Sequence, residues 1–103
     1  MHIVIFITAK DTKEAEKISQ ALVSKKLIAC ANIVRDIHSF FWWKGKVERA
    51  KEVLLILKTK RSLFKKIEKT VKSLHSYDVP EIIALPIIEG SKNYLRWMNA
   101  SLR

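Results

Sequence analysis

The spacing of hydrophobic and polar residues changes several times along the chain. Residues 2–8 are almost all β-branched or aromatic, which is typical of a strand covered on both faces. Asp11 and Glu14 then form a capping-box pattern. After them, apolar residues recur at helical spacing, at Ala15, Ile18 and Leu22. The pattern predicts a strand and then a helix that ends near Lys25–Lys26, where cations suit the helix dipole.

The middle of the chain predicts a long β-hairpin. Residues 27–43 are rich in β-branched and aromatic side chains, and this run is too long for one flat strand. We therefore expect a bend or bulge near Arg35–Asp36. Lys44–Gly45 is a turn signal, because glycine supplies the positive φ that tight turns need. Residues 47–58 then restart the apolar run as the second strand.

The remainder of the chain predicts two helices with a loop and a strand between them. From Ser62 the period is helical again, with Phe64, Ile67, Val71 and Leu74 on one face. Residues 75–81, HSYDVPE, predict a polar loop, because Val79 precedes a proline and is biased away from helix. Residues 82–88 predict a strand in which Pro86 requires an edge position or a bulge. Ser91 is a suitable cap for a short final helix.

These elements predict one α+β domain over residues 1–103. The segments IVIFITAK and VLLILKTK each precede a helix and a strand. The resulting order, β-α-β-β-α-β, is that of ferredoxin-like folds, here extended by an additional C-terminal strand or helix. A hydrophobic content of 49%, with two Gly and two Pro, excludes disorder and leaves no flexible linker.

The charge balance, +10 from 20 basic and 10 acidic residues, favours an acidic partner or nucleic acid. The lysines of residues 58–72 are equally typical of a solvated helix face, and residues 47–59 lack the aromatics on which RNA-recognition domains stack bases. We therefore expect no specific nucleic-acid partner. No apolar stretch approaches the ~20 residues that span a bilayer. A single cysteine, Cys30, forms no internal disulfide, so we expect a cytoplasmic protein without a membrane partner.

Candidate chemistry is sparse. The chain has no CxxC or HxxxH spacing and no glycine-rich phosphate loop, so we expect no enzyme. Cys30 lies among apolar residues, where cysteine usually serves as a small filler. His75 lies in a polar loop beside Tyr77, Asp78 and Glu81. It can bind copper or zinc with a nearby carboxylate, or it can only hold the loop by hydrogen bonds.

Four consecutive aromatics precede the hairpin turn: Phe40, Phe41, Trp42 and Trp43. One strand face takes only every second side chain, so a run of four predicts that both faces of this segment meet something. The partner is the protein's own core, a neighbouring subunit, a stacked base or a membrane surface.

Several motifs together resemble the CutA divalent-cation tolerance family, from Ile3 to Leu102. They are an AC before the first hairpin strand, W-x-G-K at residues 43–46, E-V-L-L-x-x-K-T at residues 52–59, and H-x-Y-D-x-P-E at residues 75–81. The resemblance implies a ferredoxin-like subunit in a homotrimer built like the PII signalling proteins. It further implies that Phe40, Phe41, Trp42 and Trp43 are anchors of the trimer interface.

The resemblance also implies binding of a divalent metal, copper(II) above all, and a role in metal tolerance. His75 matches the family motif as a metal ligand, whereas two further positions that hold Cys and His in some members are Ile7 and Leu74 here. A second implied function is binding of a small anionic metabolite in a cleft between subunits, near Cys30, Trp43, Lys58, Tyr77 and Glu81. A third is a trimeric scaffold for partner proteins.

Overall fold

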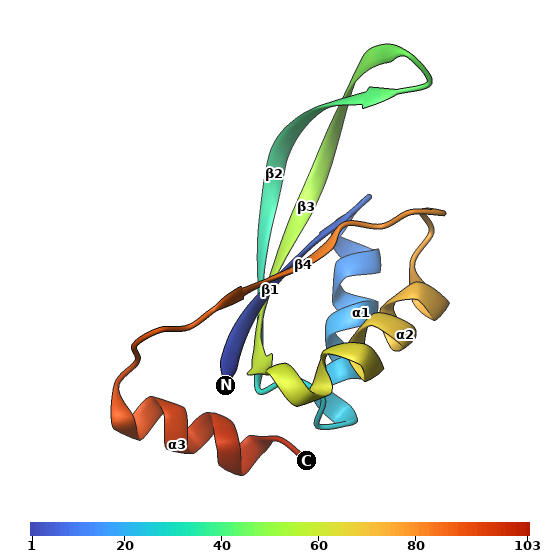
Figure 1. The fold of residues 1–103 in the computed structure, drawn as a ribbon. Helices are drawn as coiled ribbons and strands as arrows, with labels where there is room; N and C mark the ends of the chain where they lie inside the picture. Colours follow the sequence, from blue (N-terminus) through green and yellow to red (C-terminus); the bar gives the residue numbers. More distant parts are fainter.

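The computed structural model describes all residues from 1 to 103 as a four-stranded antiparallel sheet with three helices (Figure 1). The strand order is β2-β3-β1-β4, in which β3 separates the two strands that α1 connects. This is the ferredoxin-like β-α-β-β-α-β arrangement that the sequence predicted, followed by a C-terminal helix. The elements, in chain order, are β1 (His2–Ala9), α1 (Thr12–Ser24), β2 (Cys30–Trp43), β3 (Lys46–Lys60), a short 3-10 helix (Arg61–Leu63), α2 (Phe64–Leu74), β4 (Ile82–Pro86) and α3 (Lys92–Ser101).

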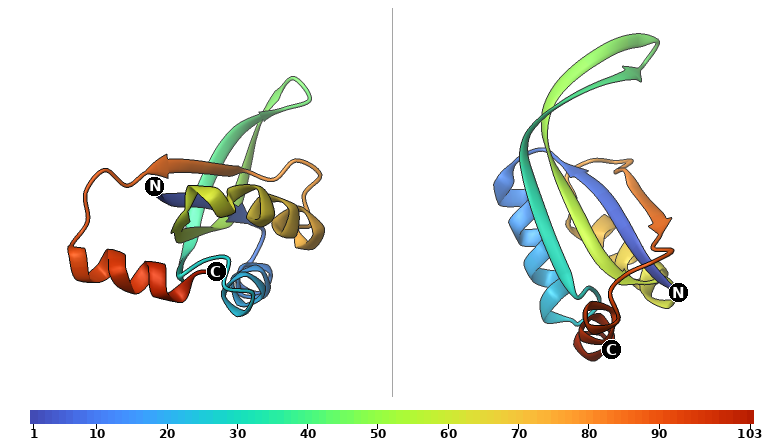
Figure 2. Two further views of the ribbon diagram at one scale, coloured as in Figure 1. Left: turned by 60° about the horizontal axis from the view of Figure 1, so that its bottom comes forward. Right: turned by 90° about the vertical axis from the view of Figure 1, so that its left-hand side faces the viewer.

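The hydrophobic core lies on one face of the sheet, under α1 and α2 (Figure 2). In β1 the odd-numbered residues, from Ile3 to Ala9, are buried, and they pack in one cluster with Ile18 of α1 and Ile67 of α2. The expectation that β1 is covered on both faces is wrong for the single chain. Val4 and Phe6 point to the face without α1 and α2 and remain partly exposed.

α1 begins and ends close to the predicted residues, with one difference in the hydrogen bonds of its N-terminal cap. The Glu14 N–H donates to Asp11 Oδ1 at 2.8 Å, as expected of an N-cap. The Glu14 carboxylate accepts from the N–H of Lys10 rather than from that of Asp11, so the capping box is displaced by one residue. α1 ends at Ser24, and Lys26 has a φ of 58°, the left-handed conformation common after helix ends.

The hairpin of β2 and β3 extends well beyond the body of the molecule and curves (Figures 1 and 2). Its register shifts between Val34 and Ile37, and Asp36 has a φ of 61°, which confirms the predicted bulge. The turn has two residues, Lys44 with φ 51° and Gly45 with φ 78°, and it joins the pair Trp43 and Lys46. Two successive positive φ angles define the type I′ turn that suits twisted strands.

Replacing Gly45 by alanine is expected to lower the free energy of unfolding by about 1 kcal/mol. A Cβ at Gly45 meets no atom within 4 Å, so the loss comes from the positive φ and not from a clash. Asparagine tolerates this conformation better, so Gly45→Asn is expected to lose less. Urea unfolding of both variants measures the difference, and equal losses would contradict the backbone explanation.

The C-terminal part of the chain forms the edge strand next to β1 and the last helix. β4 is the edge strand next to β1, and Pro86 is its last residue, so the predicted edge position is confirmed. The strand is two residues shorter than the predicted 82–88, although the Ile87 N–H still donates to the His2 carbonyl at 3.0 Å. The Ser91 hydroxyl caps α3 through the Tyr94 N–H. None of the helices is long and apolar enough to cross a membrane.

Candidate functional site

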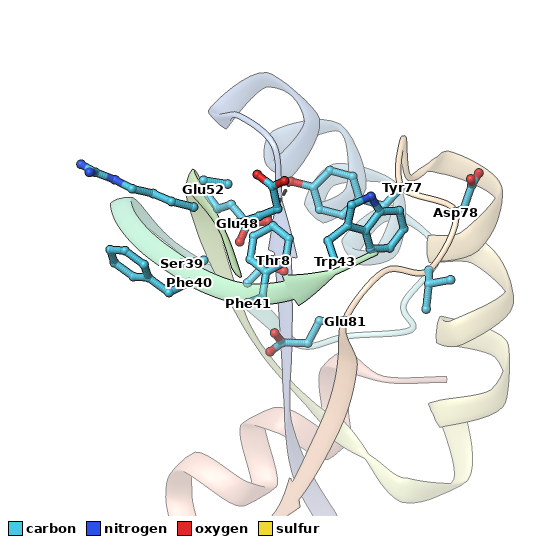
Figure 3. A pocket seen from close by; sticks show the side chains of 13 residues that line it. Thr8, Ser39, Phe40, Phe41, Trp43, Glu48, Glu52, Tyr77, Asp78 and Glu81 are labelled. Atoms are coloured by element: carbon cyan, nitrogen blue, oxygen red, sulfur yellow. Dashed lines mark hydrogen bonds between the residues drawn. The ribbon is translucent and has the colours of Figure 1, made fainter. Parts of the chain in front are cut away.

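A cleft of about 860 Å³ lies between the outer hairpin and the loop that follows α2 (Figure 3). Aromatic and acidic side chains dominate its walls. It is lined by Thr8, Ser39, Phe40, Phe41, Trp43, Glu48, Arg49, Ala50, Glu52, Tyr77, Asp78, Val79 and Glu81. We call it the acidic–aromatic cleft.

The strand register explains why these hairpin residues face the cleft. Phe41 pairs with Glu48, and Ser39 pairs with Ala50, so the two pairs lie on one face of the ribbon. Trp43 and Glu52 share this face by alternation along β2 and β3. The other face carries Phe40 and Trp42, of which only Phe40 reaches the rim of the cleft. The four aromatics are therefore divided between two faces, and each remains 40% to 74% exposed in the single chain.

His75, at the end of α2, fixes the start of the loop. Its side chain is completely buried. The ring Nε2–H donates to the Thr8 carbonyl at 2.7 Å, and Nδ1 accepts from the Tyr77 N–H at 3.1 Å. Both ring nitrogens are thus occupied by backbone groups. His75 joins β1 to the loop that carries the cleft residues Tyr77, Asp78 and Glu81.

Glu14 supports the same loop from α1. Its carboxylate accepts from the Ser76 N–H at 3.0 Å and lies 3.8 Å from His75 Nδ1. Burial raises the pKa of Glu14, but the hydrogen bonds from Ser76 and from the Lys10 N–H outweigh burial and lower the pKa overall. The ionised form is the one that holds the loop.

Glu14→Gln is expected to lower the free energy of unfolding by about 2 kcal/mol at pH 7, because hydrogen bonds to a charged acceptor are lost. A carboxyl group whose folded pKa lies below its unfolded value stabilises the fold above the unfolded pKa, near 4.5. That contribution disappears as the pH falls through the folded pKa, so the difference between the two proteins should shrink below pH 4.5. Urea titrations from pH 7 to pH 3 measure it. Glu16→Gln, on the exposed face of α1, is the control, and a constant difference at all pH values would contradict the assignment.

Tyr77 and Glu52 form the inner wall of the cleft (Figure 3). The Tyr77 hydroxyl donates to Glu52 Oε2 at 2.7 Å. Burial, this hydrogen bond and the negative charges of Glu52, Glu14 and Asp11 raise the pKa of Tyr77 far above its usual range. The phenol therefore remains a hydrogen-bond donor, and it positions the Glu52 carboxylate at the wall.

The cleft concentrates negative charge in a strongly basic chain. Glu48, Glu52, Asp78 and Glu81 line it, whereas Arg49 is its only basic residue. None of the four carboxylates takes part in an ion pair, since the ion pairs of the chain involve Asp36, Glu68 and Glu14. Glu52 is only 7% exposed. An almost buried carboxylate without a cationic partner is costly, and a bound cation would reduce that cost.

The structure brings together some of the predicted cleft residues and separates others. Trp43, Tyr77 and Glu81 line the acidic–aromatic cleft. Cys30 and Lys58 form a cross-strand pair away from the cleft. Lys58 follows Glu52 by six positions in β3, which corresponds to about 20 Å at ~3.4 Å per residue. There the Lys58 ammonium hydrogen-bonds to Asn32 Oδ1. Tyr94 of α3 also belongs to this second group of polar residues. Burial and the neighbouring Cys30 thiol raise the pKa of its hydroxyl.

A prearranged copper site is absent from the chain. No group of three or more His, Cys, Asp or Glu side chains is placed to hold a metal ion. His75 offers no free lone pair in this conformation, because both ring nitrogens are hydrogen-bonded. Ile7 is a core residue and Leu74 packs against the core. The cleft itself offers carboxylates and a phenol, which suit hard divalent cations better than they suit copper(II).

Sequence reasoning missed Glu48, Glu52, Asp78 and Thr8 as residues of the cleft. Glu48 and Glu52 lie in a strand whose motif, E-V-L-L-x-x-K-T, was noted only as a resemblance. The signal that could have found them is the hairpin register. Counting from the Lys44–Gly45 turn places Glu48 opposite Phe41 and on the face of Trp43.

Known proteins resemble this chain in sequence and in fold. The CutA1 divalent ion tolerance protein family matches residues 3–101. The chloroplastic rice protein named Protein CutA 1 is 45% identical over 101 residues, which are 98% of this chain and 57% of the rice protein. The chain thus spans little more than half the length of that relative.

Solved structures agree over the full length. The divalent cation tolerance protein of Thermus thermophilus has 43% identity and a TM-score of 0.98, with 100% of both chains covered. The periplasmic divalent cation tolerance protein CutA of Archaeoglobus fulgidus has 46% identity and a TM-score of 0.97, again with 100% of both chains covered. None of these names is that of an enzyme, and two of them refer to different compartments, the chloroplast and the periplasm. With a family match over nearly every residue and relatives above 40% identity along its whole length, the chain belongs to the CutA1 divalent ion tolerance protein family.

Proposed function

We propose that this protein contributes to metal tolerance by binding a divalent cation, copper(II) included, and that it does so as a cytoplasmic homotrimer without enzymatic activity. Family membership supports the tolerance role. The observation that carries the proposal is the set of four carboxylates, without ion pairs, that line one cleft in a chain of net charge +10. Such a cleft attracts cations locally, although the chain as a whole repels them.

Two ligand sets are compatible with this role. In the free chain no three acidic side chains are placed together to hold a metal ion, so the carboxylates of the cleft alone would hold a hard divalent ion after their side chains move toward one another. Copper(II) prefers imidazole, so it would also recruit His75, whose Nδ1 becomes free if the Tyr77 N–H moves away. His75 is thus a ligand of the bound state in this proposal and an anchor of the loop in the free state.

Isothermal titration with copper(II), and with magnesium for comparison, tests the proposal. Glu81→Gln is expected to weaken the binding of both ions about tenfold, whereas His75→Ala is expected to weaken copper(II) preferentially. Glu16→Gln, on the exposed face of α1, is the control and should leave both affinities unchanged. Equal binding by wild type, Glu81→Gln and His75→Ala would reject the cleft as the metal site.

The proposed trimer is supported by the sheet face that α1 and α2 leave open. Its side chains are mostly apolar and only partly covered in the single chain: Val4, Phe6, Val34, Leu54, Ile56, Ile83 and Leu85. A second apolar area lies on the opposite face of the hairpin ribbon, where Phe40, Trp42 and Val47 are all at least 60% exposed. An apolar area of this kind is typical of an obligate interface between copies. A trimer would also serve as the scaffold for partner proteins that the resemblance implies.

A second candidate function is binding of a small anion near Cys30 and Lys58. The favouring observation is that Lys58, Asn32 and the Tyr94 hydroxyl lie close to Cys30 on the open face, which the proposed trimer would turn toward a neighbour. Inorganic phosphate is a suitable first probe. An increase in melting temperature that Lys58→Met removes would support this function. The same increase in Lys58→Met would exclude it.

A further inference from the structure

We infer that the acidic–aromatic cleft binds a flexible organic dication, a molecule with primary ammonium groups at both ends of an alkyl chain. The inference concerns the cleft of the proposed function and shares its carboxylates, but it names a ligand class that metal tolerance does not require. Three features of the cleft lead to it: a buried carboxylate with a free oxygen, a wall of aromatic rings that accept cations, and acidic groups on opposite sides.

The first feature is the state of Glu52. This side chain is more than nine-tenths buried, and its Oε2 accepts the hydrogen bond from Tyr77. No hydrogen bond reaches Oε1, and this oxygen is not sealed inside the protein, since the only buried and unpaired side-chain atom is Ser19 Oγ. Within the single chain, Glu52 therefore presents a charged oxygen to the cleft with no cation to neutralise it. A primary ammonium group supplies both a charge and hydrogen-bond donors.

The second feature is the aromatic wall. Phe41, Trp43 and Tyr77 line the cleft together with its acidic residues, and Phe40 reaches its rim. Two of these rings already attract cations of the same hairpin: the Arg49 guanidinium lies 5.8 Å from the Phe40 centroid, and the Lys44 ammonium lies 6.0 Å from the Trp43 centroid. Aromatic faces bind alkylammonium groups through cation–π attraction and bury their methylene groups as well. A strongly hydrated metal ion uses neither contribution.

The third feature is the distribution of charge. Glu48 and Glu52 come from β3, whereas Asp78 and Glu81 come from the loop on the other side (Figure 3). Four carboxylates against Arg49 leave three negative charges in excess at the cleft. A ligand with an ammonium group at each end contacts both walls, and its alkyl chain crosses the aromatic surface between them. A cleft of about 860 Å³ has room for such a molecule.

Calorimetric titration of the full chain with 1,4-diaminobutane and spermidine, at about 150 mM salt so that exposed charges are screened, tests the inference. The neutral analogue is 1,4-butanediol. We expect both amines to bind and the diol not to bind. Glu52→Gln keeps an acceptor for Tyr77 and removes the charge, so it should weaken both amines at least tenfold. Trp43→Leu should weaken them several-fold. Glu16→Gln on α1 should have no effect, and circular dichroism confirms that each variant is folded.

The inference is overturned if the amines bind no better than the diol, or if Glu52→Gln and Trp43→Leu bind them as wild type does. The inference is also overturned if the amines do not bind because a lysine of a neighbouring copy already fills the cleft. Copper(II) titration of the same samples separates this inference from the proposed function. Copper binding without amine binding rejects only the organic ligand, and amine binding without copper binding rejects only the metal.

Discussion

Replacing His75 by alanine is expected to lower the free energy of unfolding by about 3 kcal/mol and to loosen the loop of the acidic–aromatic cleft. The substitution removes a completely buried ring and leaves the Thr8 carbonyl and the Tyr77 N–H without their partners. It also leaves a cavity beside Glu14. Urea unfolding measures the loss, and hydrogen exchange at the amides of Ser76 and Tyr77 reports whether the loop has become mobile.

Two further variants decide what His75 does. Ser73→Ala lies in the same turn of α2 and removes only an exposed hydroxyl, so it should change stability by less than about 0.5 kcal/mol. His75→Asn retains part of the hydrogen bonding and should recover part of the loss. If His75→Ala unfolds at the same urea concentration as wild type, His75 does not anchor the loop, and the structural account of this residue is wrong.

Replacing Phe40 and Trp42 together by serine is expected to separate the proposed trimer into single chains. Both side chains lie on the outer face of the hairpin, at 68% and 74% exposure, and have little to cover them within the chain. Burial of such surface between copies contributes about 25 cal/mol per Å² at each of three equivalent contacts. The binding free energy lost with two large aromatics at every contact should therefore be larger than the remaining contacts can supply.

Sedimentation equilibrium measures this change directly, because three chains of 12.0 kDa give about 36 kDa. The double variant should sediment as a species near 12.0 kDa. Lys46→Ser, at the exposed tip of the same hairpin, is the control and should leave the mass unchanged. A wild-type protein of 12.0 kDa would reject the trimer altogether, and a trimeric double variant would remove the outer hairpin face from the interface.

Much of the fold could be predicted because its signals are local. The bulge at Arg35–Asp36 follows from a run too long for a flat strand, and the turn at Lys44–Gly45 follows from the need for positive φ. The edge position of β4 follows from the missing N–H of Pro86. Each of these predictions depends on a few neighbouring residues, and the structure confirms each one.

The cleft could be predicted only in part because it depends on contacts between distant segments. Tyr77 meets Glu52 across 25 positions of sequence, and His75 meets Thr8 across 67. Composition pointed to a basic protein, whereas the cleft gathers four of the ten acidic residues in one place. No local pattern shows that concentration. It appears only when the hairpin curves toward the loop.

The proposed trimer offers one explanation both for the failed prediction that β1 is covered on both faces and for the separation of Cys30 and Lys58 from Tyr77. A continuous apolar strand such as β1 indicates that both of its faces are buried. It does not indicate whether the same chain or another chain covers each face. In the single chain, α1 and α2 cover one face, and Val4 and Phe6 stay half-open on the other. In the proposed trimer, further copies of the chain would complete that face and would bring the Cys30 end of one chain near the cleft of another.

The central claim is that the acidic–aromatic cleft is a metal-ion site, and native mass spectrometry tests it most directly. Wild type, Glu52→Gln and Glu16→Gln are each measured before and after addition of copper(II), with magnesium for comparison. We predict a three-chain species that retains one copper ion per chain in wild type and Glu16→Gln and loses it in Glu52→Gln. Retention of the same number of copper ions by all three proteins, or no retention by wild type, would contradict the claim.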